Sequence, residues 1–328
     1  MAEIEKRPKP SGITVREALR RLIRHENGVL VIVVLALVAV LGGRTGGMML
    51  TRDNAMNIVL QSSTRGVAAV GQAFVILTAG IDLSVGGLAL MAMTLGASIM
   101  TGTIALPIGP LAIMLLFGAA MGALNGLSVS RIGMPALIVT LAMWQIMQGG
   151  AFQISKGATI ASLPSFVSFL GAGRIAGTPI PVIIFVVVGV VAYLVLHHTT
   201  FGRSVYAVGG NPVSAWLSGI KVKNTLFWVY VISGFTAALA GMIIMGRIAC
   251  ASMAAAIGLE LDSIASVCVG GISLMGGRGT IIGVIIGVMI IGLINNGMNM
   301  MGTHSSIQIM VKGLIIFTAV AVDYLRRR

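Results

Sequence analysis

Long uninterrupted apolar runs recur along almost the whole chain, and this feature limits the possible folds more than any other. Each run is close to the roughly 20 residues that a helix needs to cross the hydrocarbon core of a bilayer. Only helices and closed barrels satisfy the backbone in lipid, and a barrel strand would alternate apolar with polar residues. Because these runs are continuously apolar, they predict membrane-spanning helices.

The composition agrees with this interpretation. Of the 328 residues, 57% are hydrophobic and 9% are charged, and the mean hydropathy is +1.01, whereas soluble domains are about one quarter charged. The net charge of +13 could indicate a nucleic-acid partner. The cations lie in tails and short loops, however, which is typical of membrane topology. We therefore expect a membrane domain and no nucleic-acid partner.

We predict an all-α membrane protein with about ten transmembrane helices. Their ranges are 28–43, 56–79, 83–102, 105–130, 134–153, 180–198, 225–246, 255–275, 280–300 and 306–323. An even number places both termini on one side of the membrane. Fifteen of the 22 Lys and Arg residues then lie on that side and five on the other, so the positive-inside rule makes it cytoplasmic.

The predicted organisation is simple. Residues 1–27 form a basic cytoplasmic tail that leads into an uncleaved first span, because no small-residue cleavage site follows the first apolar run. Residues 28–325 form one transmembrane domain with a cytoplasmic loop at about 199–224, and residues 326–328 form a basic C-terminal tail. The loop 155–178 is expected outside the cell, with room for a short surface helix.

Small residues predict close helix packing. Glycines recur every fourth residue in two sets, at positions 118, 122 and 126 and at positions 279, 283 and 287, which places each set on one helix face. The pattern Gly-Ile-x-Leu-x-x-Gly also occurs twice, at 80–86 and at 271–277, in turns between predicted spans. It raises the possibility of a duplicated architecture.

Few charges fall inside the predicted spans. Arg65 and Lys312 each face a cavity, a partner or the interface, or else extend toward water along their aliphatic stems. The acids near spans are expected at span ends; they are Asp82, Glu260, Asp262 and Asp323. Asp82 can cap the backbone amides of the third span or act as a gate contact.

Neutral amides are more frequent inside the spans than charges. They suit a hydroxyl-rich solute, although hydrogen bonding between helices explains them equally well. With Asp82, the candidate pathway or gate residues are Gln72, Asn125, Gln145, Gln148, Asn295, Asn296 and Asn299. Aromatic residues make up only 5% of the chain, so we expect the solute to be recognised mainly by another protein.

No stretch indicates catalysis, a cofactor or a metal. No Lys follows a Gly, so the phosphate-binding loop GxxxxGK[ST] is missing, and any ATP that drives the protein must be bound by another subunit. The four histidines lie near span ends without a catalytic arrangement. Cys250 and Cys268 lack metal-ligand spacing, so we interpret them as packing residues.

The loop 199–224 contains the signals of a short capped helix. Asn211 suits an N-cap, Pro212 the first helical position and Gly219 the C-cap. Val213, Trp216, Leu217 and Ile220 would form an apolar side that the loop can hardly bury. The spacing leaves two interpretations open, a docking surface for a soluble partner and a helix lying on the lipid interface.

Four motifs in one order resemble a known family. They are AGIDLSVGGL at 79–88, GRSVYAVGGN at 202–211, LELDSIASVCVGGISLMGGRGT at 259–280 and GLINNGMNMMG at 292–302. From about residue 54 to its end, the chain resembles the permease subunits of the ribose, xylose, galactose and autoinducer ABC importers.

The resemblance implies a non-catalytic permease of the bacterial inner membrane that imports a monosaccharide of the pentose or hexose class. Its expected partners are a second permease copy, identical or related, a cytoplasmic ATPase with two nucleotide-binding domains that carries ATP and Mg, a periplasmic or extracellular sugar-binding protein, and membrane lipid. The alternatives are an ion-coupled secondary carrier for a neutral polar solute and a membrane receptor.

The resemblance also favours docking for the loop helix, which would fit a cleft on the ATPase. This implied role falls on Gly202, Arg203, Gly209, Gly210, Asn211, Pro212 and Ala215. Trp216 and Gly219 complete the candidate coupling loop.

Overall fold

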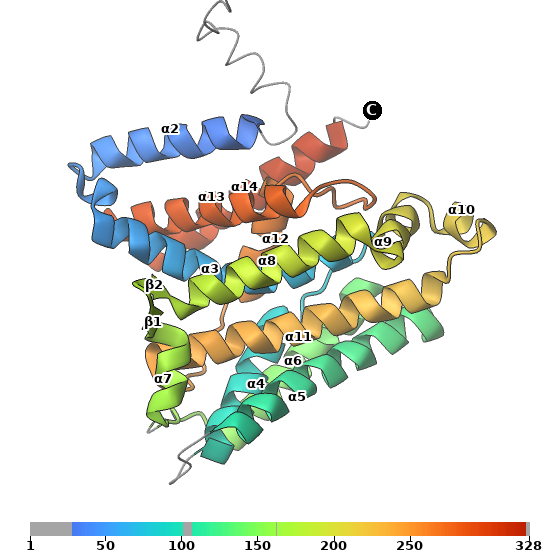
Figure 1. Ribbon diagram of the computed structural model, residues 1–328, viewed down its shortest axis with the longest axis horizontal. Helices are drawn as coiled ribbons and strands as arrows, with labels where there is room; N and C mark the ends of the chain where they lie inside the picture. Colours follow the sequence, from blue (N-terminus) through green and yellow to red (C-terminus); the bar gives the residue numbers. More distant parts are fainter. Residues whose placement is uncertain (1–27, 101–106, 162, 326–328) are drawn as a thin grey trace, which may run out of the picture.

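The computed structural model describes residues 28–100, 107–161 and 163–325. The two basic tails that we predict to be cytoplasmic, 1–27 and 326–328, lie outside the described residues. The described chain is almost entirely helical (Figure 1), which confirms the all-α class.

The elements follow one another in a simple order. The helices of the first half are α2 (Gly28–Arg44), η1 (Met48–Leu50), α3 (Arg52–Leu77), α4 (Val85–Met100), α5 (Ile108–Leu127), η2 (Ser128–Ile132) and α6 (Ala136–Ser155). Then come α7 (Ser165–Ala172), the strands β1 (Arg174–Ile175) and β2 (Thr178–Pro179), α8 (Ile180–His198), α9 (Thr200–Gly210) and α10 (Pro212–Leu217). The last elements are α11 (Val222–Ile248), α12 (Leu259–Val269), α13 (Ile281–Met300) and α14 (Ser305–Leu325).

Each of the ten predicted ranges contains a helix. Within the described residues, six helices are long and apolar enough to cross a membrane; they are α5 continued by η2, α6, α8, α11, α13 and α14. The apolar helices α2 and α4 are shorter, with 17 and 16 residues. Helix α3 has 26 residues but is more polar, and α12 has only 11.

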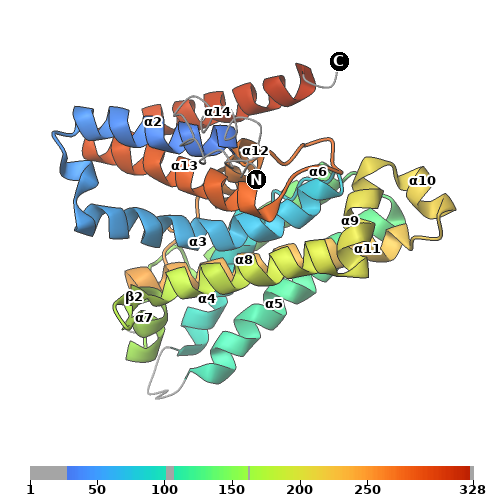
Figure 2. The same ribbon diagram turned by 45° about the horizontal axis from the view of Figure 1, so that its top comes forward.

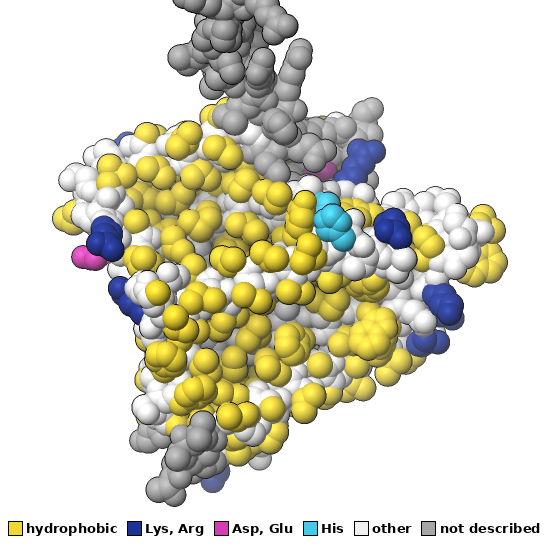
Figure 3. All heavy atoms as spheres, in the orientation of Figure 1, with side chains coloured by type: hydrophobic (Ala, Val, Ile, Leu, Met, Phe, Trp, Pro, Cys, Tyr) yellow, Lys and Arg dark blue, Asp and Glu magenta, His cyan; other side chains and the backbone are white. Residues whose placement is uncertain are grey.

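The long helices form a bundle whose two ends differ. Helices α9 and α10 lie at one end, while α7 and the β1–β2 hairpin lie at the other (Figures 1 and 2). Helix α7 is the surface helix predicted for the loop 155–178. Hydrophobic side chains cover the face formed by α8 and α11, and Lys and Arg gather mostly at the ends (Figure 3), as expected for a protein that crosses a membrane.

Helix α11 is the centre of the bundle and contacts α3, α4 and α5 along its length. A methyl group on Gly118, Gly122 or Gly126 of α5 would overlap the backbone of α11, which confirms the predicted close contact. A methyl group on Gly287 would overlap the Ser266 carbonyl of α12, and Gly283 lies against Gly270 just after α12, whereas Gly279 precedes α13 in a turn with φ +125°. The second glycine face is therefore one residue shorter than predicted.

Helix α12 begins at the buried residue Leu259 and ends at Val269, so it is shorter than the predicted span 255–275. The segment between α11 and α12 is irregular, because Ala249 and Gly258 adopt positive φ values of 54° and 81° that interrupt a helix. Within this segment Ala251 exchanges two backbone hydrogen bonds with Ile160, at 2.8 and 2.9 Å. The eighth predicted range thus contains a short helix preceded by extended and turn backbone.

Candidate functional site

Helix α10 forms with the caps that the sequence predicts. The Asn211 Oδ1 accepts hydrogen bonds from the backbone N–H groups of Val213 and Ser214, both at 2.9 Å. At the other end Gly219 has φ +81°, and Ile220 donates its N–H to the Ala215 carbonyl at 3.0 Å. Both ends of this six-residue helix are therefore closed by local contacts alone.

The free side of α10 is apolar and open. Val213, Trp216 and Leu217 are 64%, 68% and 73% exposed, whereas Ala215 on the opposite side is buried. Three adjacent large apolar side chains at the tip of a loop are typical of a binding surface for a protein or a membrane. We call Val213, Trp216 and Leu217 the apolar tip.

The first part of the predicted loop is a second helix, α9, which the sequence analysis did not separate from the loop. Thr199 caps it by accepting a hydrogen bond from the Gly202 N–H at 3.1 Å. A methyl group on Gly202 would overlap the end of α8, and one on Gly209 would overlap the Leu77 carbonyl at the end of α3. Arg203 and Gly210 are exposed.

Helix α9 packs where the two glycine turns meet. The Gly277 N–H donates to the Leu77 carbonyl at 2.9 Å, so the turn after α12 is bonded to the end of α3. The Tyr206 hydroxyl of α9 donates to the Gly279 carbonyl at 2.9 Å. The second occurrence of Gly-Ile-x-Leu-x-x-Gly thus contacts the residues just before the first occurrence, and both contact α9 there. We call the contacts among Leu77, Gly209 and Gly277 the glycine junction.

Three of the candidate pathway residues meet in one buried cluster around Asp82. One Asp82 oxygen accepts hydrogen bonds from the Ser84 N–H at 2.9 Å and the Ser84 hydroxyl, and the other accepts from the Ser233 hydroxyl at 2.7 Å. Asn125 donates to the Ser84 hydroxyl at 2.9 Å. In the amide orientation that satisfies both of its ends, Gln72 donates to the Asp82 backbone carbonyl at 3.0 Å and accepts from the Asp82 N–H at 3.1 Å. This network fits the capping role of Asp82.

The remaining amides do not join this cluster. Asn296 and Asn54 exchange two hydrogen bonds at 2.9 and 3.0 Å, and Asn299 accepts one from Gln308 at 2.8 Å. Asn295 is buried, and neither of its side-chain polar atoms has a hydrogen-bond partner. On α6, Gln145 is exposed and Gln148 is half-buried. Of these five amides, Asn296 and Asn299 therefore connect helices.

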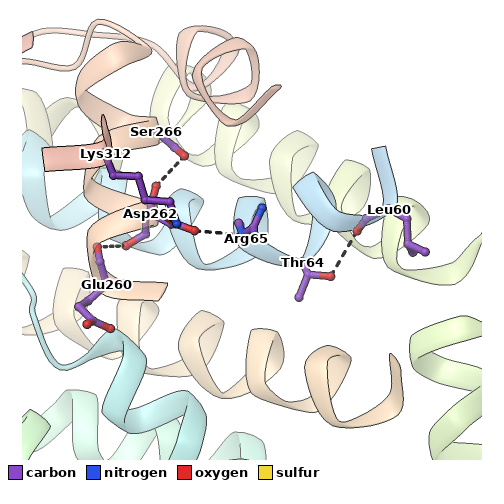
Figure 4. A network of polar contacts seen from close by, with 8 residues as sticks. Leu60, Thr64, Arg65, Glu260, Asp262, Ser266 and Lys312 are labelled. Atoms are coloured by element: carbon purple, nitrogen blue, oxygen red, sulfur yellow. Dashed lines mark hydrogen bonds and ion pairs between the residues drawn. The ribbon is translucent and has the colours of Figure 1, made fainter. Parts of the chain in front are cut away.

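A charged cluster that the sequence analysis did not assemble lies between α3, α12 and α14 (Figure 4). One oxygen of Asp262 lies 3.1 Å from the Arg65 Nε, and the other lies 2.7 Å from the Lys312 Nζ. The Asp262 side chain is only 6% exposed, against 26% for Arg65 and 22% for Lys312. Of the two interpretations for Arg65 and Lys312, the structure thus favours a partner. We call these three residues the charged triad.

Asp262 lies at a helix end, as expected, but the triad places that end beside α3. Arg65 lies in the middle of α3, about 18–20 Å from either end at 1.5 Å per residue. Asp262 is in the first turn of α12, where the helix dipole favours a carboxylate. The signal was present in the sequence as three isolated charges, but only the fold shows that they meet.

The triad connects a helix that is otherwise loosely attached. Helix α14 has no buried residue. Its polar contacts include Lys312 with Asp262, Gln308 with Asn299, and Asp323 with Ser273 at 2.6 Å. Such a helix can move without uncovering much apolar surface of its own.

Comparison with known proteins defines the class. Residues 54–320 match the family model described as branched-chain amino acid transport system / permease component. The chain belongs to this family, so it is a membrane permease component and not an enzyme.

Individual relatives match along most of their length. The chain is 38% identical to the ribose import permease protein of Escherichia coli K12 over 306 residues, 92% of this chain and 94% of the relative. It is 37% identical to the D-allose transport system permease protein of the same organism, with 88% and 89% covered, and 36% identical to the fructose import permease protein of Rhizobium meliloti, with 90% and 84% covered. No solved structure matches.

Proposed function

We propose that this chain is the permease subunit of an ATP-driven, binding-protein-dependent importer of a monosaccharide in the bacterial inner membrane. The observation that carries the proposal is the similarity, along nearly the whole chain, to three import permeases whose names specify ribose, allose and fructose. All three solutes are neutral and hydroxyl-rich, which agrees with the neutral amides inside the bundle.

The proposed assembly contains three kinds of component. Two permease copies, identical or related, form the membrane part. A cytoplasmic ATPase with two nucleotide-binding domains binds ATP and Mg, and a periplasmic or extracellular protein delivers the sugar. In this arrangement the permease spans the membrane about ten times, and both of its ends are cytoplasmic. The positive-inside rule supports this orientation, because the sequence predicts fifteen Lys and Arg residues on the cytoplasmic side and five on the other.

The apolar tip of α10 is the proposed contact with the ATPase. Local caps hold α10 as a unit, and α9 connects it to the glycine junction. Movement of the ATPase would therefore reach the end of α3 and the turn after α12 through packed backbone, where a shift in one element displaces its neighbours. Residues Gly202, Gly209 and Tyr206 are the positions at which α9 transmits this movement.

One observation favours a second candidate, an ion-coupled secondary carrier. A buried carboxylate next to an interrupted helix, as found at Asp262 and α12, is typical of ion sites in such carriers. The two cations that already bind Asp262 oppose this, because they occupy both of its oxygens.

A reconstitution experiment separates the two functions. Uptake of labelled ribose, allose and fructose is measured in vesicles that contain the permease, its ATPase and its binding protein, with each component omitted in turn. We expect uptake of one sugar that needs ATP and all three components. Uptake by the permease alone that stops when an uncoupler is added would support the secondary carrier instead.

The docking contact has its own test. Replacing Trp216 and Leu217 with Ser removes the apolar tip but leaves the caps of α10 intact, and we expect the ATPase to be lost during co-purification. Ser218→Ala, at an exposed position next to the tip, is the matched control. Retention of the ATPase by the Trp216 and Leu217 variant would contradict docking.

A further inference from the structure

The two halves of α3 differ in their surroundings. Every residue from Gly66 to Leu77 is buried. Nearer the start, by contrast, Asp53 and Asn57 are exposed and Gln61 and Arg65 are partly exposed. These four residues are spaced by four, so they share one face of the helix. We call Asp53, Asn57, Gln61 and Arg65 the polar stripe; it ends where α3 becomes enclosed.

A polar stripe of this kind does not suit lipid. Amide and guanidinium groups in hydrocarbon lose their hydrogen bonds to water, and in membrane helices they usually face the protein interior or an aqueous route. Asp53 by itself also fits the start of a helix, where a carboxylate is favoured. Asn57, Gln61 and Arg65 lie further in and have no such explanation.

The inner end of the stripe is a concentration of polar groups. Arg65 pairs there with Asp262, which also pairs with Lys312. Three buried groups near this level of α3 and α13 have polar atoms without a hydrogen-bond partner: the Ser62 hydroxyl, one Arg65 nitrogen and the Asn295 amide. Ser62 packs over Gly292, one turn from Asn295. Buried polar groups normally find partners, so these atoms are available to a polar guest.

We infer that the polar stripe lines the route of the transported solute and that the charged triad closes it. This inference rests on the proposed function and assigns a site to it. A sugar with several hydroxyl groups can donate to the Asp262 carboxylate and accept from Arg65 and Lys312. Asn57 and Gln61 supply both donors and acceptors along the approach to the triad.

Opening the route requires the triad to loosen. Lys312 belongs to α14, which has no buried residue, so its displacement breaks few apolar contacts within the chain. Sugar hydroxyl groups that donate hydrogen bonds to Asp262 replace part of the interaction that Lys312 makes with this carboxylate. Solute binding and movement of α14 are therefore linked through one carboxylate, since both compete for its oxygens.

Thiol accessibility tests the inference independently of sugar uptake. Cys250 and Cys268 are first replaced with Ala, and single cysteines are placed at Asn57 and Gln61. Two matched controls are Val190→Cys, on the apolar helix α8 at a similar distance from its start, and Ala68→Cys, which continues the face of Gln61 beyond Arg65 and is buried. A charged, membrane-impermeant methanethiosulfonate is added outside right-side-out vesicles that contain the complete importer.

We expect cysteines at 57 and 61 to react at least tenfold faster than the cysteine at 190, and the cysteine at 68 to react as slowly as that at 190. Adding Lys312→Met is expected to speed labelling at 68 severalfold. Equal labelling rates at 57, 61 and 190 would overturn the route. This includes the case in which contact with the second permease copy shields the stripe and slows labelling at 57 and 61. Unchanged labelling at 68 after Lys312→Met would overturn the closing role of the triad. Since labelling does not require transport, failure of every sugar in the uptake assay would reject the proposed function alone.

Discussion

Two aspartates, Asp82 and Asp262, are buried at similar places in the fold but are stabilised in different ways. Each lies at the N-terminal end of a helix that begins inside the protein, Asp82 just before α4 and Asp262 in the first turn of α12. The partners of Asp82 are a backbone amide and two hydroxyl groups. Those of Asp262 are the cations Arg65 and Lys312.

The difference separates a fixed connection from one that can change. The Asp82 network joins α3, α5 and α11 through short hydrogen bonds, in a region next to the glycine junction where helices touch through glycine. The Asp262 network holds α14, which is otherwise exposed. Hydrogen bonds from neutral donors make one region rigid, whereas ion pairs in the other can be exchanged for hydroxyl groups of a solute or for water.

The largest effect is expected from Asp262→Asn. The substitution keeps the shape but leaves two cations without their carboxylate, and breaking a buried ion pair from one side costs about 3–5 kcal/mol. Because Arg65 and Lys312 are partly exposed, we expect the free energy of unfolding to fall by about 3 kcal/mol. Equilibrium unfolding in mixed micelles measures it, with the exposed Asp53→Asn as control. A loss below that of the control would remove the distinction between the two aspartates.

The next effect is expected at the glycine junction, where Gly209 and Gly210 form a matched pair. A methyl group on Gly209 would overlap the Leu77 carbonyl and approach the Gly277 nitrogen, whereas one on Gly210 meets nothing within 4 Å. Overpacking of this kind costs about 1–3 kcal/mol. Gly209→Ala should also lower the sugar imported per ATP hydrolysed by displacing α9. Equal transport by the two variants would show that the junction is not a rigid connection.

Removing one cation of the triad should have a smaller effect than removing its carboxylate. In Arg65→Met or Lys312→Met, Asp262 keeps one cation, so each variant should lose about 1 kcal/mol or less. The double variant should lose more than the sum, because the carboxylate is then left unpaired. The same unfolding assay tests this cycle, and strictly additive losses would show that the two cations do not share one partner.

The sequence predicts the helices better than the contacts between them. All ten predicted ranges contain helix, because long apolar runs and local caps such as those of Asn211 and Gly219 depend on neighbouring residues. Helix α9 was missed because its glycines, Gly202 and Gly209, suggest a loop, although they serve close contacts with α8 and α3. The start of α12 was predicted too early in the chain, because an apolar segment can also adopt extended backbone when other helices bury it.

The same contrast holds for the functional residues: the sequence marks them one by one, but their contacts depend on the fold. Gln72, Asp82 and Asn125 were selected one by one as polar residues in apolar runs, and the structure brings them into one network. The charged triad combines residues from positions 65, 262 and 312, whose proximity depends on the packing of three helices. No local pattern encodes such a meeting, so a single sequence can mark each charge but cannot pair them.

The smallest effect is expected from Asp82→Asn, the same chemical change as at Asp262. The amide oxygen of Asn can still accept from the Ser84 N–H and hydroxyl, while its NH₂ faces Ser233, whose hydroxyl can turn and accept. One hydrogen bond is reoriented and no cation is left unpaired, so the loss should stay below about 1 kcal/mol. Asp82→Ala, which leaves the Ser233 hydroxyl without its acceptor, is the comparison that shows the assay can detect damage here. If Asp82→Asn instead destabilises the protein as much as Asp262→Asn, the Asp82 site depends on negative charge, and the contrast between a neutral cap and an ionic connection fails.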